Sequence, residues 1–128
     1  MEAAEYKNIF ENEETHFYYD LIQKETLALI NKYLPHSNSL KILDAGCGTG
    51  LLAKKLAKFG QVDAVDKNQI AVKFAKKRGV KALIASVTRL PFAENYFDLG
   101  TSIDVLGHRW VESDTHALSE LYRVLKPS

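Results

Sequence analysis

The chain of 128 residues has a single cysteine, almost no net charge and no long hydrophobic run. One cysteine cannot form a disulfide within the chain. The 17 Lys and Arg against 16 Asp and Glu leave a formal net charge of +1, so no overall field attracts nucleic acid or an anionic membrane. No apolar run approaches the ~18 residues of a membrane span, and the N-terminus MEAAEYKNIF is too polar for a signal peptide. These absences predict a cytoplasmic protein that binds neither nucleic acid nor membrane.

The stretch LKILDAGCGTG, residues 40–50, carries the clearest pattern. Its apolar first half predicts a short buried strand of a parallel sheet. Three glycines at alternate positions follow: Gly46, Gly48 and Gly50. Glycine accepts positive φ and lets a ligand lie against bare backbone. Because an amphipathic helix is predicted directly afterwards, over residues 51–59, the order of strand, glycine loop and helix indicates a ligand site.

The residue before the glycines, Asp44, indicates the charge of that ligand. A dinucleotide fingerprint needs a third glycine at position 51, where this chain has Leu51. A pyrophosphate at the start of the helix would also be repelled by the carboxylate of Asp44. An acid at this place suits a ligand with a cation and no phosphate. S-adenosylmethionine, with its ammonium, sulfonium and ribose diol, fits that description.

The segment LDAGCGTG resembles the first motif of the class I S-adenosylmethionine-dependent methyltransferases. The resemblance covers residues 40–127, and LPF at 90–92 with FDL at 97–99 is similar to the small-molecule, type 11-like members. It implies an α/β fold, a Rossmann-like doubly wound parallel sheet with helices on both faces. About four strands in the order 3-2-1-4 are expected. The chain ends at LKPS, where the family continues into a fifth strand, so a C-terminal truncation is expected.

Periodicity and turn residues divide the rest of the chain. We expect an N-terminal helical segment over 1–38 and a Rossmann-like core over 39–128 that binds the cofactor. The predicted helices cover residues 18–34, 69–78 and 115–126, after a short helix or arm within 1–16. Further strands are predicted over 62–66, 80–85 and 97–103. The basic run at 76–78 is interpreted as complementing the dipole of its own helix.

Cofactor contacts are predicted at the carboxyl edge of the sheet. Asp66 ends the second strand, where a carboxylate can accept two hydrogen bonds from a ribose diol; Asp63, earlier in the strand, is the rival. The resemblance gives Asp44 to the methionine ammonium. It places further cofactor contacts at Ala45, Gly46, Cys47, Gly48, Gly50, Lys67, Ser86, Val87 and Ser102. The family usually has Asp where this chain has Ser86, and a hydroxyl accepts the bond from the adenine amino group more weakly.

The acceptor side of the site is predicted less sharply. His108 follows the fourth strand, where a neutral imidazole could act as a general base, and Asp104 is a second candidate; either could instead be structural. His16, Tyr18 and Tyr19 are candidates for contact with the substrate, with core packing as the alternative. Cys47 is a possible thiol nucleophile, although a small residue that packs in the loop is the preferred interpretation. The histidines bring no set of carboxylates or thiols, so no metal site is predicted.

The predicted function is methyl transfer from S-adenosylmethionine to a small-molecule acceptor, with S-adenosylhomocysteine as product. One alternative is a non-catalytic half-domain that binds the cofactor or only a partner chain. A weaker alternative is an NAD-dependent oxidoreductase, against which Leu51 and Asp44 argue. Because the fourth strand would be an edge with little charge, we also expect a homodimer or a partner chain to pair with it.

Overall fold

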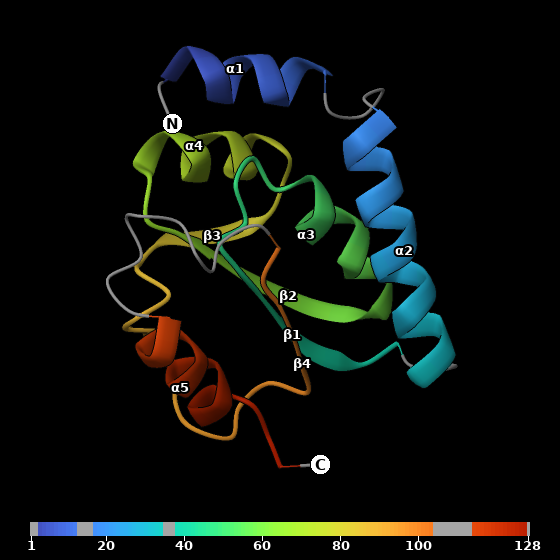
Figure 1. Ribbon diagram of the computed structural model, residues 1–128, viewed down its shortest axis with the longest axis vertical. Coiled ribbons are helices and arrows are strands. Elements are labelled where there is room, and N and C mark those ends of the chain that lie inside the picture. Colours follow the sequence, from blue (N-terminus) through green and yellow to red (C-terminus); the bar gives the residue numbers. More distant parts are fainter. Residues whose placement is uncertain (1–2, 13–16, 35–37, 104–113, 128) are drawn as a thin grey trace.

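The structure of the chain is a computed structural model that describes residues 3–12, 17–34, 38–103 and 114–127. Its elements, in chain order, are the helices and strands α1 (Ala3–Asn12), α2 (Phe17–Tyr33), β1 (Leu40–Ala45), α3 (Leu51–Leu56), the 3₁₀ turn η1 (Ala57–Phe59), β2 (Gly60–Asp66), α4 (Gln69–Lys77), β3 (Lys81–Ile84), β4 (Leu99–Thr101) and α5 (Asp114–Val124). Figure 1 shows them with these labels.

The four strands form one parallel sheet in the order β3-β2-β1-β4, which confirms the predicted class and strand order. In the register of the sheet, Asp44 of β1 lies between Ala64 of β2 and Thr101 of β4. Since all strands run the same way, their carboxyl ends share one edge, and that edge faces α1 and α4 (Figure 1). Open parallel sheets bind their ligands at this edge.

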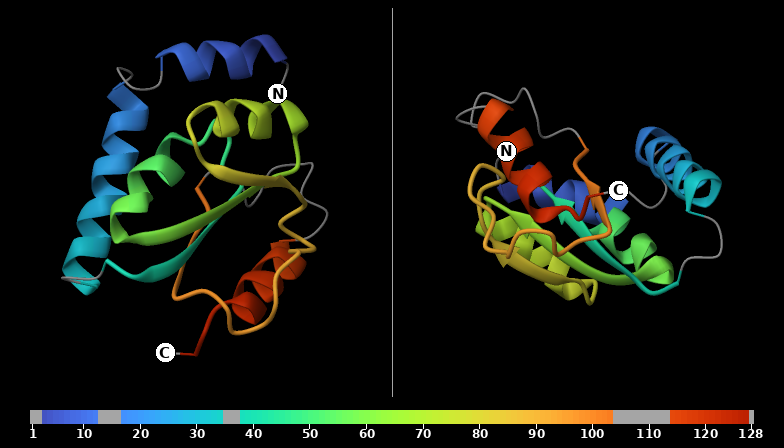
Figure 2. Two further views of the ribbon diagram at one scale, coloured as in Figure 1. Left: turned by 180° about the vertical axis from the view of Figure 1, so that it is seen from behind. Right: turned by 90° about the horizontal axis from the view of Figure 1, so that it is seen from below.

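Helices cover both faces of the sheet, as predicted. Successive side chains of a strand point to opposite faces. Leu43 of β1 therefore belongs to a core cluster with Val124 of α5, whereas Ala64 of β2 belongs to a second cluster with Val72 of α4. Figure 2 shows α4 and α5 on opposite sides of the sheet. The sheet is thus buried between two helical layers, which leaves its carboxyl edge for a ligand.

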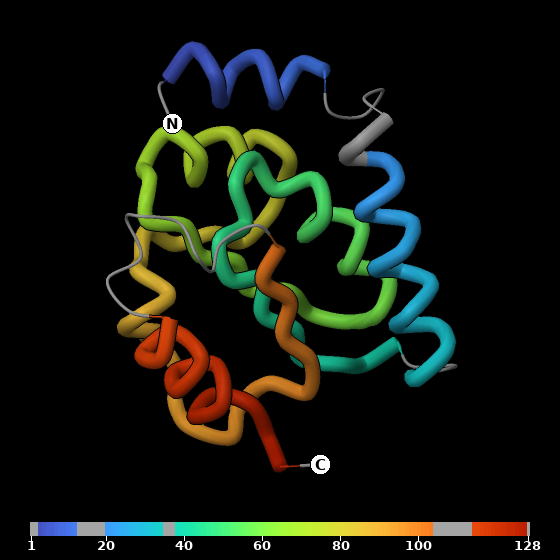
Figure 3. Tube along the Cα trace, in the orientation of Figure 1, coloured from blue at the N-terminus to red at the C-terminus, as the bar shows by residue number. Residues whose placement is uncertain are grey.

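The two N-terminal helices differ in how they are held. Helix α2 inserts Ile30 into a cluster with Ile42, Leu56 and Phe59, so it is part of the core. Helix α1 has no buried residue and lies along α4 (Figure 3). The predicted helix over 18–34 is confirmed by α2, and the predicted short helix or arm is α1. No helix within the described ranges is long and apolar enough to cross a membrane.

The fourth strand is shorter than predicted. It covers Leu99–Thr101, so the expected range of 97–103 is wrong at both ends. Phe97 is fully buried and forms an isolated parallel bridge with Leu125, in the segment after α5. Its N–H donates to the carbonyl of Val124 at 2.9 Å, and its carbonyl accepts from the N–H of Lys126 at 2.9 Å. Phe97 therefore anchors the segment after α5 instead of extending β4 along β1.

Candidate functional site

The glycine loop begins with two hydrogen bonds that fix it to the neighbouring strand. The N–H groups of Gly46 and Cys47 both donate to the carbonyl of Val65 in β2, each at 2.8 Å. The chain leaves β1 here because these bonds turn the backbone toward β2 instead of continuing the strand. The loop therefore has a defined position over the carboxyl ends of β1 and β2.

Glycine is required at two positions of the loop for different structural reasons. Gly48 and Gly50 have φ of 56° and 86°, which confirms the predicted positive φ. A Cβ on Gly50 would lie 2.8 Å from the Cβ of Ala75, so the loop packs on α4 only because Gly50 has no side chain. A Cβ on Gly48 would meet no atom within 4 Å. Gly48 thus borders open space, as a backbone that receives a ligand must.

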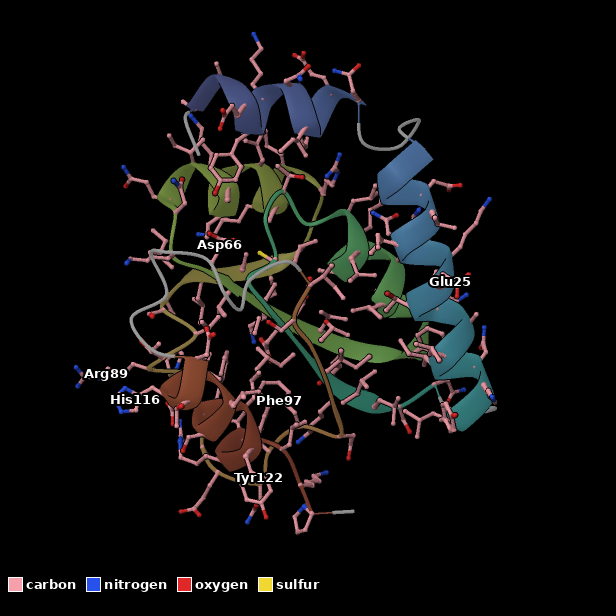
Figure 4. All side chains as sticks on the ribbon, in the orientation of Figure 1. Glu25, Asp66, Arg89, Phe97, His116 and Tyr122 are labelled. Atoms are coloured by element: carbon pink, nitrogen blue, oxygen red, sulfur yellow. The ribbon has the colours of Figure 1, made fainter. Side chains whose placement is uncertain are left out.

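Asp66 is the carboxylate that lies at the glycine loop. Its Oδ2 accepts from the N–H of Gly48 at 2.9 Å, and its Oδ1 accepts from the N–H of Asn68 at 2.9 Å. Figure 4 labels Asp66 at the end of the sheet that faces α1. The rival Asp63 forms an ion pair with Lys81 of β3 at 3.3 Å. A carboxylate has about four acceptor positions, so both oxygens of Asp66 retain the capacity to accept from a diol.

Asp44 is a buried carboxyl at the same edge, with 2% of its surface exposed. The hydroxyl of Thr101 in β4 donates to its Oδ1 at 2.8 Å. Burial raises the pKa of Asp44 to about 6; the bond from Thr101 opposes this, and the charge of Asp66 adds to it. Within the described part of the chain, no ion pair compensates its charge. A cationic ligand would supply that compensation.

Two serines predicted as cofactor contacts differ in their hydrogen bonding. Ser102, directly after β4, has a buried Oγ with no partner among the described residues. The Oγ of Ser86 lies 2.7 Å from the hydroxyl of Thr88 and accepts from the N–H of Thr88 at 3.2 Å. Val87, between them, is buried in the cluster on the α5 side. Ser102 is therefore a polar group without a partner, while Ser86 shares its hydroxyl with Thr88.

Cys47 behaves as a packing residue. Its side chain packs against the cluster that α3 and α4 form on the sheet, and burial raises the pKa of its thiol well above the usual range. A thiol that stays protonated is a poor nucleophile, which favours the packing interpretation. Ala45 is fully buried on the α5 side, and Lys67, directly after Asp66, is exposed.

The sequence predicts five residues on the acceptor side of the site. His16, Asp104 and His108 lie outside the described residues, as do the side chains of Tyr18 and Tyr19 in α2. Within the ranges that are described, no three His, Cys, Asp or Glu side chains come together as a metal site would require.

Sequence reasoning missed Tyr6 and Arg78. Burial, followed by the negative charge of Asp66, raises the pKa of Tyr6 to about 12, so this side chain of α1 lies within the field of the site. Arg78, which ends α4, donates to the carbonyl of Thr49 in the glycine loop at 3.0 Å. Tyr6 and Phe10 are four residues apart on one helical face, a signal that could have been used. No local pattern indicates the contact of Arg78.

We expect Asp44→Asn to stabilise the protein without ligand at neutral pH. The folded pKa of about 6 lies above the reference value of 3.8, so this carboxyl favours folding only while it is protonated. That contribution is complete below pH 3.8 and is lost as the pH rises through 6. Relative to the wild type, the free energy of unfolding of the variant should therefore rise by about 2–3 kcal/mol between pH 4 and pH 7. Urea unfolding at several pH values measures it.

Asp98→Asn is the matched control. The N–H of Lys41 holds the pKa of Asp98 below its usual range, so its ionised form favours folding. The effect of this substitution should have the opposite sign above pH 4. A pH-independent difference between the wild type and Asp44→Asn would contradict the assignment of a raised pKa to Asp44.

Comparison with known proteins identifies the family. A family model described as a methyltransferase domain matches residues 43–128. Malonyl-[acyl-carrier protein] O-methyltransferase of Buchnera aphidicola is 39% identical over 92 residues, which cover 70% of this chain and 36% of the relative. The ubiquinone/menaquinone biosynthesis C-methyltransferase of Rickettsia felis is 37% identical over 112 residues, covering 76% of this chain and 44% of the relative.

A solved structure of a protein from Methanococcus maripaludis has the same fold, with a TM-score of 0.81 and 25% identity over 98% of this chain and 59% of the other. This chain thus spans less than half the length of the two named relatives. The matched family model covers the glycine loop, both acids and everything after them. The chain belongs to the class I S-adenosylmethionine-dependent methyltransferases.

Proposed function

We propose that this chain binds S-adenosylmethionine against its glycine loop and transfers the methyl group to a small-molecule acceptor, which leaves S-adenosylhomocysteine. The observation that carries the proposal is the pair of carboxyl groups, Asp44 and Asp66, at one edge of the sheet beside a loop with positive φ. Two acids disfavour a phosphate and favour a ligand with a cation and hydroxyl groups.

The methionine ammonium is assigned to Asp44. The carboxyl is buried, has a raised pKa and lacks an ion-pair partner in the described chain. Burying an ionised carboxylate without a partner costs free energy. An ammonium beside it would favour the ionised form. The buried Oγ of Ser102 lies at the end of the strand that carries Thr101, the hydrogen-bond donor to Asp44. Ser102 is therefore a second polar group for the methionine part.

The ribose is assigned to Asp66. Its carboxylate is held in place by the N–H groups of Gly48 and Asn68, so its orientation is fixed before a ligand arrives. The open space beside Gly48 leaves room for a ligand next to this carboxylate. Ser86 and Lys67 are proposed to contact the adenine. Thus the described residues offer a matching group for the ammonium and for the diol.

The chemistry requires little covalent help from the protein. When bound, the cofactor would supply a sulfonium methyl group whose carbon an acceptor atom attacks in line, while the carbon–sulfur bond breaks and the thioether S-adenosylhomocysteine leaves. The chain has to hold the donor and exclude other geometries, which is the main source of rate enhancement for such a reaction. We propose His108, or Asp104, as the base that removes the acceptor's proton, and His16, Tyr18 and Tyr19 as acceptor contacts. The near-zero net charge supports a small molecule over a nucleic acid.

A non-catalytic half-domain is the second candidate. The observation that favours it is coverage, since this chain spans 36% and 44% of the lengths of the two named relatives. Such a domain would hold the cofactor, or only a partner chain, without turnover. The proposed cofactor contacts Asp44, Gly48 and Asp66 lie within the described residues, so binding and turnover have to be measured separately.

Isothermal titration of the chain with S-adenosylmethionine tests the function, with NAD as the competing ligand. We expect S-adenosylmethionine to bind and NAD not to bind. Gly48→Ala is the matched variant, because its added methyl group would enter the open space beside the loop; we expect affinity to fall by about tenfold or more. Binding of NAD alone would revive an oxidoreductase, and binding of neither would favour an interaction module. Binding without methyl transfer to any small-molecule acceptor would favour the non-catalytic half-domain.

Ser86→Asp tests the proposed adenine contact. Aspartate can keep the bond from the N–H of Thr88 and offer a charged acceptor to the adenine amino group. Charge-assisted hydrogen bonds are roughly twice as strong as neutral ones, so S-adenosylmethionine should bind about fivefold tighter. Ser86→Ala should bind it about threefold more weakly. An aspartate variant that binds no tighter than the wild type would remove Ser86 from the site.

We also propose that a second copy or a partner chain pairs with β4. This strand is one edge of the sheet, and the bridge between Phe97 and Leu125 lies two residues before its start. The bridge is parallel, so this edge already accepts a parallel neighbour at its beginning. Unpaired edge groups with little charge nearby favour pairing with another chain.

Light scattering over a wide range of protein concentration measures this association. We expect the mass to rise toward that of two chains, and Ile103→Lys to suppress the rise because a charge at the edge opposes pairing. Leu83→Lys, on the opposite edge strand β3, is the matched control and should leave the mass unchanged. A mass of one chain at every concentration would contradict self-association.

A further inference from the structure

Arg78 joins three segments that are far apart in the sequence. It ends α4, and its Nη1 donates to the carbonyl of Thr49 at 3.0 Å and to the Oγ1 of Thr49 at 3.1 Å. Its Nη2 donates to the carbonyl of Phe10 in α1 at 2.9 Å, and its guanidinium lies 4.4 Å from the centre of the Phe10 ring. One planar group therefore connects the glycine loop to α1.

The connection to the loop is firm. Thr49 is only 3% exposed and lies between Gly48 and Gly50, both of which have positive φ. Gly50 packs on Ala75 of α4, so the loop and the helix that carries Arg78 form one packed unit. A displacement of Thr49 would therefore change its hydrogen bonds with the guanidinium of Arg78.

The connection to α1 is the weaker side. Among the described residues of α1 none is buried, so the helix is held by contacts at its surface. They include the ring contact between Phe10 and Phe74, with centres 4.8 Å apart, and the two interactions of Phe10 with Arg78. Elements with few buried apolar contacts open at low cost. The interactions of Arg78 are thus among the contacts that hold α1 against α4.

Helix α1 also reaches the site. Tyr6, one turn before Phe10, lies within the field of Asp66, the acid proposed to hold the ribose. The position of α1 on α4 therefore affects the interaction between this phenol and the carboxylate of Asp66. Lysine could not replace the arginine, because a single ammonium lacks the planar fork that serves two carbonyls on different segments.

We propose that Arg78 is a positioning residue that couples the packing of α1 on α4 to the glycine loop, and so sets how long the cofactor stays bound. The proposal rests on the proposed function, because it needs a cofactor in the loop. Arg78 does not touch the reacting atoms. It acts through α1, which the guanidinium joins to the glycine loop by holding both Thr49 and Phe10 and which lies at the carboxyl edge of the sheet.

Release of S-adenosylhomocysteine from the full chain, measured by stopped-flow competition, tests the proposal. Arg78→Gln and Arg78→Lys should each release it about tenfold faster, since both lose one or more charge-assisted bonds. Lys76→Gln, which removes the same charge from the same helical turn, should release it at the wild-type rate. Hydrogen exchange supplies a second readout: binding should protect residues 3–12 in the wild type and not in Arg78→Gln.

A double-mutant cycle separates coupling from general damage. Phe10→Ala alone should also speed release, and Arg78→Gln added to it should cause less than a further twofold change, because both act through α1. If Arg78→Gln does not fold, Phe10→Ala carries the test by its release rate and the protection of residues 3–12. Wild-type release from a folded Arg78→Gln, or from Phe10→Ala, would overturn the proposal. Absence of binding by the unaltered chain would overturn the proposed function as well.

Discussion

The burial of a carboxyl group at the end of β1 is the constraint on which the site depends. Asp44 is placed there by the register of the sheet, between β2 and β4, and among the described residues only the hydroxyl of Thr101 offsets its burial with a hydrogen bond. A fold that only needed stability would have an apolar residue at this position. The free-energy cost of burying this carboxylate is offset if a cationic group of a ligand binds beside it. The burial of Asp44 therefore indicates a ligand with a cation.

The second acid shows how the loop and the sheet depend on each other. Asp66 accepts from Gly48, and the loop in turn begins with two bonds to Val65, the residue before Asp66. The strand end and the loop therefore hold each other in position without any ligand. Arg78 extends this arrangement to α1, so that the ribose side of the site is connected to a helix whose own contacts are at its surface.

The sequence predicted the position of the glycine loop because local patterns indicate it: apolar runs, glycine spacing and acids at strand ends. The strand order was expected from the resemblance to the methyltransferase family, and the sheet has that order. The sequence also favoured Asp66 over Asp63, and the structure places Asp66 at the loop. It could not predict the contact between Arg78 and Phe10, since 68 positions separate them and neither has a distinctive neighbourhood. The predicted range of β4 was wrong at its start, where Phe97 pairs with Leu125 after α5. The division at residue 38 stays a prediction, although α2 shares a core cluster with β1.

We propose that the ammonium of the cofactor forms an ion pair with the carboxylate of Asp44. Calorimetry at pH 6 in buffers of different ionisation enthalpy measures the protons released when S-adenosylmethionine binds. With a pKa of about 6, the carboxyl is half protonated in the free protein, and an adjacent cation must displace that proton. We expect the wild type to release about half a proton and Asp44→Asn to release none at saturation. Binding with no proton released by the wild type would contradict it.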